Sequence, residues 1–201
     1  MKKLLVFLAV IICLNAKASS QSYFFLLGVS GGSVTHGATI DSLTEGSVSN
    51  AATMDINFSS FTSAYQVIFI EFTAAPASNA VNLECLVSAN GSTFDNSSAQ
   101  YDWWFGTFNT GSNSASSAFI EMVGSEVNTA GTRVTGSFQI NDPASTAFHP
   151  QILFNCAAVG SQEYSVTGGG RRINAQATQA VRLLFSSGNI TGYYKVFGMK
   201  N

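Results

Sequence analysis

The 201-residue sequence contains few charged residues, because Asp, Glu, Lys and Arg together make up only 10% of it. A typical soluble protein contains about 25%. Serine, threonine, asparagine and glycine stand in their place, so the expected surface is polar but nearly neutral. A surface helix normally carries charged residues on its solvent side. The shortage of charge therefore argues against long surface helices and favours β structure, as do the 16 phenylalanines and six tyrosines.

Basic clusters and metal-ligand patterns are also missing. The formal net charge is −2, and no run of Lys and Arg marks a surface for nucleic acid. His36 and His149 are the only histidines and lack the spacing of a zinc-ligand pair. No run of acidic residues resembles an EF-hand loop. The sequence therefore predicts no metal, no cofactor and no nucleic-acid partner.

The first 18 residues have the three-part pattern of a secretory signal peptide. Lys2 and Lys3 are the positive start, residues 4–14 are apolar, and residues 16–18 (AKA) supply small alanines at the expected cleavage positions. An apolar run of this length is too short for a membrane span, which needs about 20 residues. Residues 1–18 are therefore expected to be a cleaved signal peptide or, alternatively, a retained apolar N-terminal anchor, and no transmembrane span is expected in the mature chain.

Two cysteines, Cys85 and Cys156, remain after the expected cleavage. An exported chain would fold in an oxidising compartment, where two cysteines can form a disulfide. The alternative is that both are small buried apolar side chains in strands. Their spacing does not decide between a disulfide and two free thiols.

Apolar and polar residues alternate in short runs that Gly, Asn, Ser or Pro clusters separate, which predicts about nine β-strands. Parallel β-α-β units would need crossover helices, and no convincing helix is found. The sequence therefore predicts an all-β fold, an antiparallel β-sandwich of the jelly-roll-like kind. The expected strands are residues 54–58, 65–72, 81–88, 101–108, 119–123, 133–140, 152–159, 181–185 and 190–199.

The expected sandwich domain covers residues 51–201, and residues 19–50 form an expected N-terminal arm rich in Gly, Ser and Thr. Within the sandwich, residues 110–117 (TGSNSASS) are expected to form a polar loop. Residues 168–170 (GGG) are expected to form a flexible, exposed loop. No internal repeat and no clear second sandwich domain is found.

One motif suggests catalysis. Residues 28–32 (GVSGG) match the G-x-S-x-G pattern around a hydrolase nucleophile, here Ser30. That motif requires a strand before it and a helix after it, and the following residues have no helical period. Proximity in the chain alone would join Ser30 to His36 and Asp41. We therefore expect a glycine-rich loop, no catalytic residues and no enzymatic activity.

The densest aromatic cluster is formed by Tyr101, Trp103 and Trp104. Adjacent residues of a strand point to opposite faces, so one tryptophan can lie in the core while the other is exposed. Exposed aromatic side chains are frequent in binding hot spots. The three residues are therefore candidate binding residues, for a sugar ring or a partner chain. The alternative is that the two sheets bury both tryptophans.

Two segments resemble jelly-roll domains of bacteriophage virion appendage proteins, such as tail fibres, capsid fibres and decoration proteins. The end of the chain matches their Gly-x-Tyr/Phe-x-x-x-Tyr/Phe-Gly pattern with Gly192, Tyr193, Phe197 and Gly198. Residues 58–65 (FSSFTSAY) resemble the polar corner that leads into a strand beginning with Tyr. The resemblance spans residues 51–201.

The resemblance implies a virion structural module with a fibre, receptor-binding or capsid-decorating role. It also implies a homo-oligomer, commonly a trimer, with other virion proteins as partners. The alternative function is a secreted, periplasmic or cell-surface bacterial module that binds a cell-surface glycan. A retained leader favours the virion, whereas a cleaved leader and an exposed Trp103 or Trp104 favour the secreted module.

Overall fold

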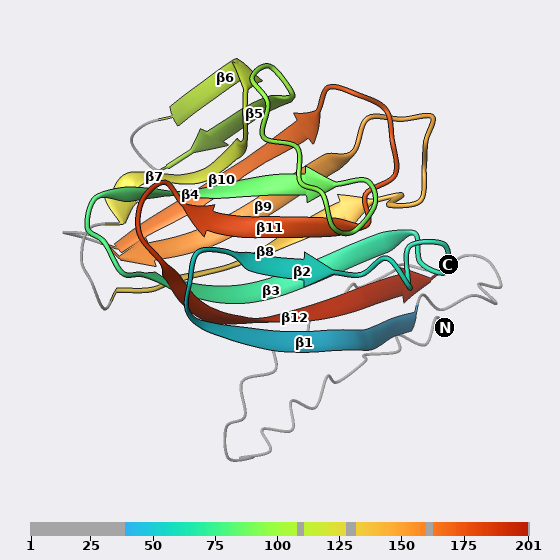
Figure 1. Cartoon of the computed structure of the whole chain (residues 1–201), viewed down its shortest axis with the longest axis horizontal. Coiled ribbons are helices and arrows are strands. Elements are labelled where there is room, and N and C mark those ends of the chain that lie inside the picture. Colours follow the sequence, from blue (N-terminus) through green and yellow to red (C-terminus); the bar gives the residue numbers. More distant parts are fainter. Residues whose placement is uncertain (1–38, 108–110, 128–131, 160–162, 201) are drawn as a thin grey trace, which may run out of the picture. The chain divides into compact units, whose positions relative to one another are not determined.

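The computed structural model describes residues 39–107, 111–127, 132–159 and 163–200, and this part of the chain consists of β-strands and connecting segments (Figure 1). None of these residues belongs to a helix long and apolar enough to cross a membrane. The strands are β1 (Thr39–Ala51), β2 (Met54–Asn57), β3 (Val67–Pro76), β4 (Val81–Ser88), β5 (Tyr101–Gly106), β6 (Gly111–Ser117), β7 (Ile120–Val127), β8 (Val134–Asn141), β9 (Gln151–Val159), β10 (Glu163–Arg172), β11 (Ala180–Phe185) and β12 (Ile190–Lys200).

The strands form two antiparallel sheets (Figure 1). The larger sheet has eight strands in the order β1-β12-β3-β8-β9-β10-β5-β6. The smaller sheet has four, in the order β2-β11-β4-β7. The prediction of an all-β antiparallel sandwich is confirmed, with twelve described strands instead of about nine.

The sequence pattern misses three of these strands. β1 begins at Thr39, inside the expected N-terminal arm, and β6 occupies the expected polar loop. Both are edge strands. Much of each strand is solvent-exposed, so the alternation of apolar and polar residues in its sequence is weak. β10 contains Gly168, Gly169 and Gly170, so the expected flexible loop is wrong there. The expected leader and residues 19–38 of the arm lie outside the described residues.

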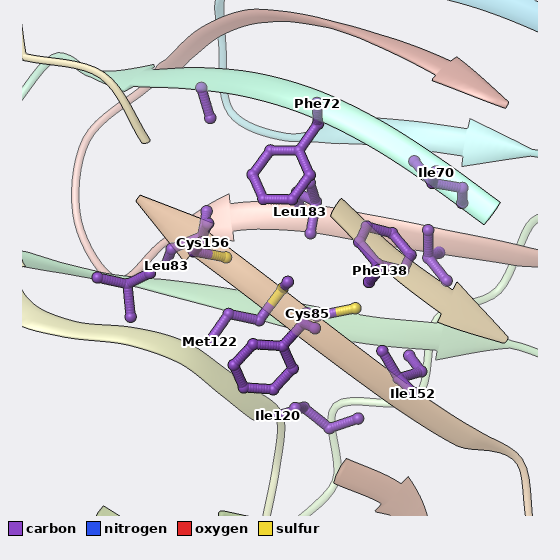
Figure 2. Close-up of a cluster of buried hydrophobic side chains, with 14 of the residues drawn as sticks. Ile70, Phe72, Leu83, Cys85, Ile120, Met122, Phe138, Ile152, Cys156 and Leu183 are labelled. Atoms are coloured by element: carbon purple, nitrogen blue, oxygen red, sulfur yellow. The ribbon is translucent and has the colours of Figure 1, made fainter. Parts of the chain in front are cut away.

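The hydrophobic core lies between the two sheets (Figure 2). The larger sheet contributes side chains such as Phe72 and Phe138, whose rings lie 5.9 Å apart. The smaller sheet contributes side chains such as Leu83 and Met122. Alternation along each strand explains this arrangement, since every second residue faces the other sheet.

Cys85 and Cys156 are part of this core, on β4 and β9, and both are free thiols (Figure 2). Burial disfavours the charged thiolate and raises the pKa of each thiol to about 12. The possible disulfide is therefore absent, and the two cysteines are small apolar core residues with little nucleophilic character.

One carboxyl group of the smaller sheet is buried. Glu84 of β4 lies opposite Glu121 of β7 and is only 8% exposed. Burial and, to a smaller extent, the neighbouring charge of Glu121 together raise the pKa of Glu84 from 4.5 to about 7. The folded protein therefore holds the proton on Glu84 more tightly than the unfolded chain does.

This difference predicts pH-dependent stability. The stabilising contribution of protonated Glu84 is present below pH 4.5 and is lost as the pH rises through about 7. The expected loss is at most about 3 kcal/mol, at 1.36 kcal/mol per pKa unit. Glu84→Gln should remove most of this pH dependence in chemical unfolding measured from pH 4.5 to 8, and Glu121→Gln should reduce it. An unchanged slope in Glu84→Gln would contradict the assignment.

Candidate binding face on the eight-stranded sheet

Strand β5 presents Trp104 to solvent and turns its neighbours inward. Trp104 is 54% exposed, whereas Trp103 is 8% exposed and Tyr101 is fully buried. The prediction that the two tryptophans point to opposite faces is therefore confirmed. Tyr101 and Trp103 are wrong as ligand-binding candidates, because their inward positions in the strand place them in the core.

The two buried residues fix the position of β5. The ring of Trp103 stacks on Phe105 with centroids 5.6 Å apart. The Tyr101 hydroxyl accepts a hydrogen bond from the Val87 N–H at 3.0 Å and donates one to the Asp95 carbonyl at 2.9 Å. Burial raises the pKa of Tyr101 to about 12, so this hydroxyl keeps its proton. Trp104 therefore stands on a strand that is anchored on its inner face.

A glycine separates Trp104 from the next large apolar side chain on the outer face. Gly169 of β10 lies opposite Trp104 on one side and opposite Leu153 of β9 on the other. Leu153 is about half exposed. Since Gly169 has no side chain, the backbone of β10 forms the surface between Trp104 and Leu153. We call these three residues the Trp104 platform.

Two polar pairs border the Trp104 platform, one on each side along the strands. Arg171 donates hydrogen bonds from Nε and Nη2 to Asp102 Oδ2, at 2.9 and 2.7 Å. The Thr167 hydroxyl donates to Asn155 Oδ1 at 2.8 Å. All four side chains lie on the outer face, since Arg171 and Thr167 are each two residues from Gly169 in β10. An apolar surface with fixed polar groups around it is the usual composition of a small-ligand site.

The segment between β4 and β5 borders a hollow of about 390 Å³. Its charged residues, Arg172 and Asp95, form an ion pair at 2.5 Å. Burial of Asp95 opposes ionisation, but hydrogen bonds from Ser97 and the charge of Arg172 outweigh it and lower the pKa of the carboxyl. The remaining lining residues are Ala89, Asn90, Thr93, Phe94, Asn96 and Gln176. Since Arg172 already has a partner, this hollow has no free cation for a ligand.

Of the residues considered for a catalytic site around Ser30, only Asp41 is among the described residues. Ser30, His36 and residues 28–32 lie outside the described residues. Asp41 accepts a hydrogen bond from the Tyr65 hydroxyl at 2.8 Å and pairs with Lys200 at 3.1 Å, so it connects β1 to the end of β12. His149 is exposed in the segment before β9.

No family model matches the sequence, and no curated protein or solved structure matches it either. The Trp104 platform is the most specific arrangement of exposed side chains described above.

Proposed function

We propose that this protein is a non-enzymatic binding module that recognises a glycan through the Trp104 platform. The observation that carries the proposal is the exposed indole of Trp104 on a rigid strand, beside Gly169 and two fixed polar pairs. The apolar face of a sugar ring can stack on the indole while its hydroxyls bond to the polar groups. A site on strands is held more firmly than one on loops, so little ordering is needed on binding.

The proposed setting of this module is a bacteriophage virion appendage, as the sequence resemblance implies. An apolar corner of the same sheet favours the self-association that this setting requires. Ile40 is strongly exposed and lies opposite Met199 of β12, which in turn lies opposite Val67 of β3. A trimer of the purified protein in light scattering would support the virion setting. A monomer would support the alternative, a secreted, periplasmic or cell-surface bacterial module.

Trp104→Ala is expected to weaken glycan binding at least about tenfold, because aromatic anchors at hot spots contribute about 2 kcal/mol or more. The measurement is the signal on an array of immobilised bacterial surface polysaccharides, followed by calorimetric titration of the polysaccharide with the highest signal. Phe148→Ala is the matched control, since Phe148 is 69% exposed but lies in the segment before β9 and is not part of the platform. Equal binding by Trp104→Ala and the unmodified protein would refute the proposal.

A further inference from the structure

The outer face of the eight-stranded sheet has another hollow, of about 430 Å³, at strands β1, β12 and β3. These three strands are neighbours in the sheet (Figure 1). This volume lies within the range of about 300–1,000 Å³ found for small-ligand pockets. Tyr193 of β12 is 52% exposed and lies opposite Ser47 on one side and Thr73 on the other. The lining residues are Ser47, Val48, Thr73, Ala75, Arg133, Thr191, Gly192 and Tyr193. The exposed Tyr193 ring thus lies among small side chains, of which Thr73 is buried.

Arg133, at the rim of this hollow, differs from the other cationic side chains. Arg171, Arg172 and Arg182 each pair with an aspartate. The two described lysines pair with Glu45 and Asp41. Among the described residues, Arg133 is the only cationic side chain without a carboxylate partner. Arg133 is exposed and lies just before β8. Because Val134 pairs with Ala74 of the antiparallel strand β3, Arg133 lies next to Ala75.

We infer that this hollow binds a sugar residue that carries an anionic group, either a carboxylate or a sulfate ester. The guanidinium of Arg133 can donate two parallel hydrogen bonds to such a group. The Tyr193 ring offers a flat apolar surface to the sugar. The Ser47 hydroxyl is available for the sugar's own hydroxyls, whereas Thr191 Oγ1 already accepts a hydrogen bond from the Asn50 N–H at 2.9 Å.

The inference rests on the proposed function, because it takes the ligand to be a glycan, and it adds the charge of that glycan. The hollow and the Trp104 platform lie on the same face, since Tyr193 and Trp104 both point outward from their strands. Five strand-to-strand steps separate β12 from β5, or about 24 Å at the usual spacing of 4.8 Å. An extended acidic polysaccharide could therefore contact both places.

The test compares three soluble tetrasaccharides, of galacturonic acid, of sulfated galactose and of unmodified galactose. Calorimetric titration of the full chain is expected to give binding at least about tenfold tighter for an anionic tetrasaccharide than for the neutral one. Arg133→Gln should abolish this difference, and Arg133→Lys should restore part of it, since lysine keeps the charge but loses the planar fork. Tyr193→Ala should weaken binding, whereas Tyr193→Phe should retain it. The tighter of the two anionic ligands identifies the group.

Equal binding of the neutral and anionic tetrasaccharides would overturn the inference, and so would an unchanged preference in Arg133→Gln. If Trp104→Ala loses array binding while Arg133→Gln behaves as the unmodified protein, the proposed function stands and the anionic subsite fails. If only Arg133→Gln loses binding, the subsite stands and the role of Trp104 fails. The side chains of Arg133, Tyr193 and Trp104 are exposed, so their replacement is expected to leave the fold intact. Thermal unfolding of each variant checks this.

Discussion

Trp103→Ala is expected to lower the free energy of unfolding by about 3–5 kcal/mol, as large-to-small changes in a core do. The indole is buried and stacks on Phe105 at nearly parallel ring planes, 8° apart. Its removal leaves a cavity next to a strand that also positions Trp104. The measurement is chemical unfolding at constant pH, with the free energy extrapolated to water.

Two variants test the cause of this loss. Trp103→Phe should cost much less than Trp103→Ala, because it keeps a ring against Phe105 and removes an indole N–H that has no hydrogen-bond partner. Trp104→Ala should change the free energy of unfolding by only about 0.5 kcal/mol, as exposed positions usually do. Similar large losses in Trp103→Ala and Trp104→Ala would contradict the inward and outward placement of the two side chains.

Gly168→Ala is expected to destabilise the protein by about 3 kcal/mol, at the upper end of the usual cost of overpacking. A Cβ at Gly168 would clash with the Trp104 carbonyl oxygen and would lie 2.5 Å from the Phe154 ring. The carbonyl belongs to a neighbouring strand of the same sheet, so relief requires a shift of the backbone. Calorimetric melting is expected to show a midpoint lower by several degrees.

Gly169→Ala is the matched control, one residue further along β10. A Cβ there would lie 3.1 Å from the end of the flexible Leu153 side chain and 3.3 Å from the Ile152 carbonyl oxygen. The expected change in the free energy of unfolding is within about 1 kcal/mol, because a lower entropy of the unfolded chain partly offsets the tight contact. A larger loss at Gly169 than at Gly168 would contradict the assignment of Gly168 to the inner face and Gly169 to the outer face.

The sequence predicts the fold class because most strands bury every second residue. The resulting alternation of apolar and polar residues can be recognised in the sequence alone. The three strands that it misses lack this signal for physical reasons. β1 and β6 are edge strands whose residues remain largely in solvent, and β10 has glycines where apolar side chains would alternate. Gly168 and Gly170 lack side chains because Phe154 and Ile120 occupy that space, and this crowding depends on distant strands.

The candidate site is predicted only in part. Alternation within one strand is enough to expect that either Trp103 or Trp104 is exposed. The partners of Trp104, namely Gly169 and Leu153, are adjacent to it only through the register of three strands, which the sequence does not specify. The same is true of Arg133, just before β8, and Tyr193 of β12, since β8 and β12 lie on either side of β3.

The position of β12 between β1 and β3 has a consequence for biosynthesis. β1 pairs with no other strand of its sheet, so it has no partner until residues 190–200 leave the ribosome. Translation proceeds at about 5–20 residues per second, and the roughly 140 residues in between take about 7–30 s. During this time one side of the apolar strand β3 also has free hydrogen-bonding groups, which makes it a template for aggregation. The nascent chain is therefore expected to need a chaperone at β3 until β12 is inserted.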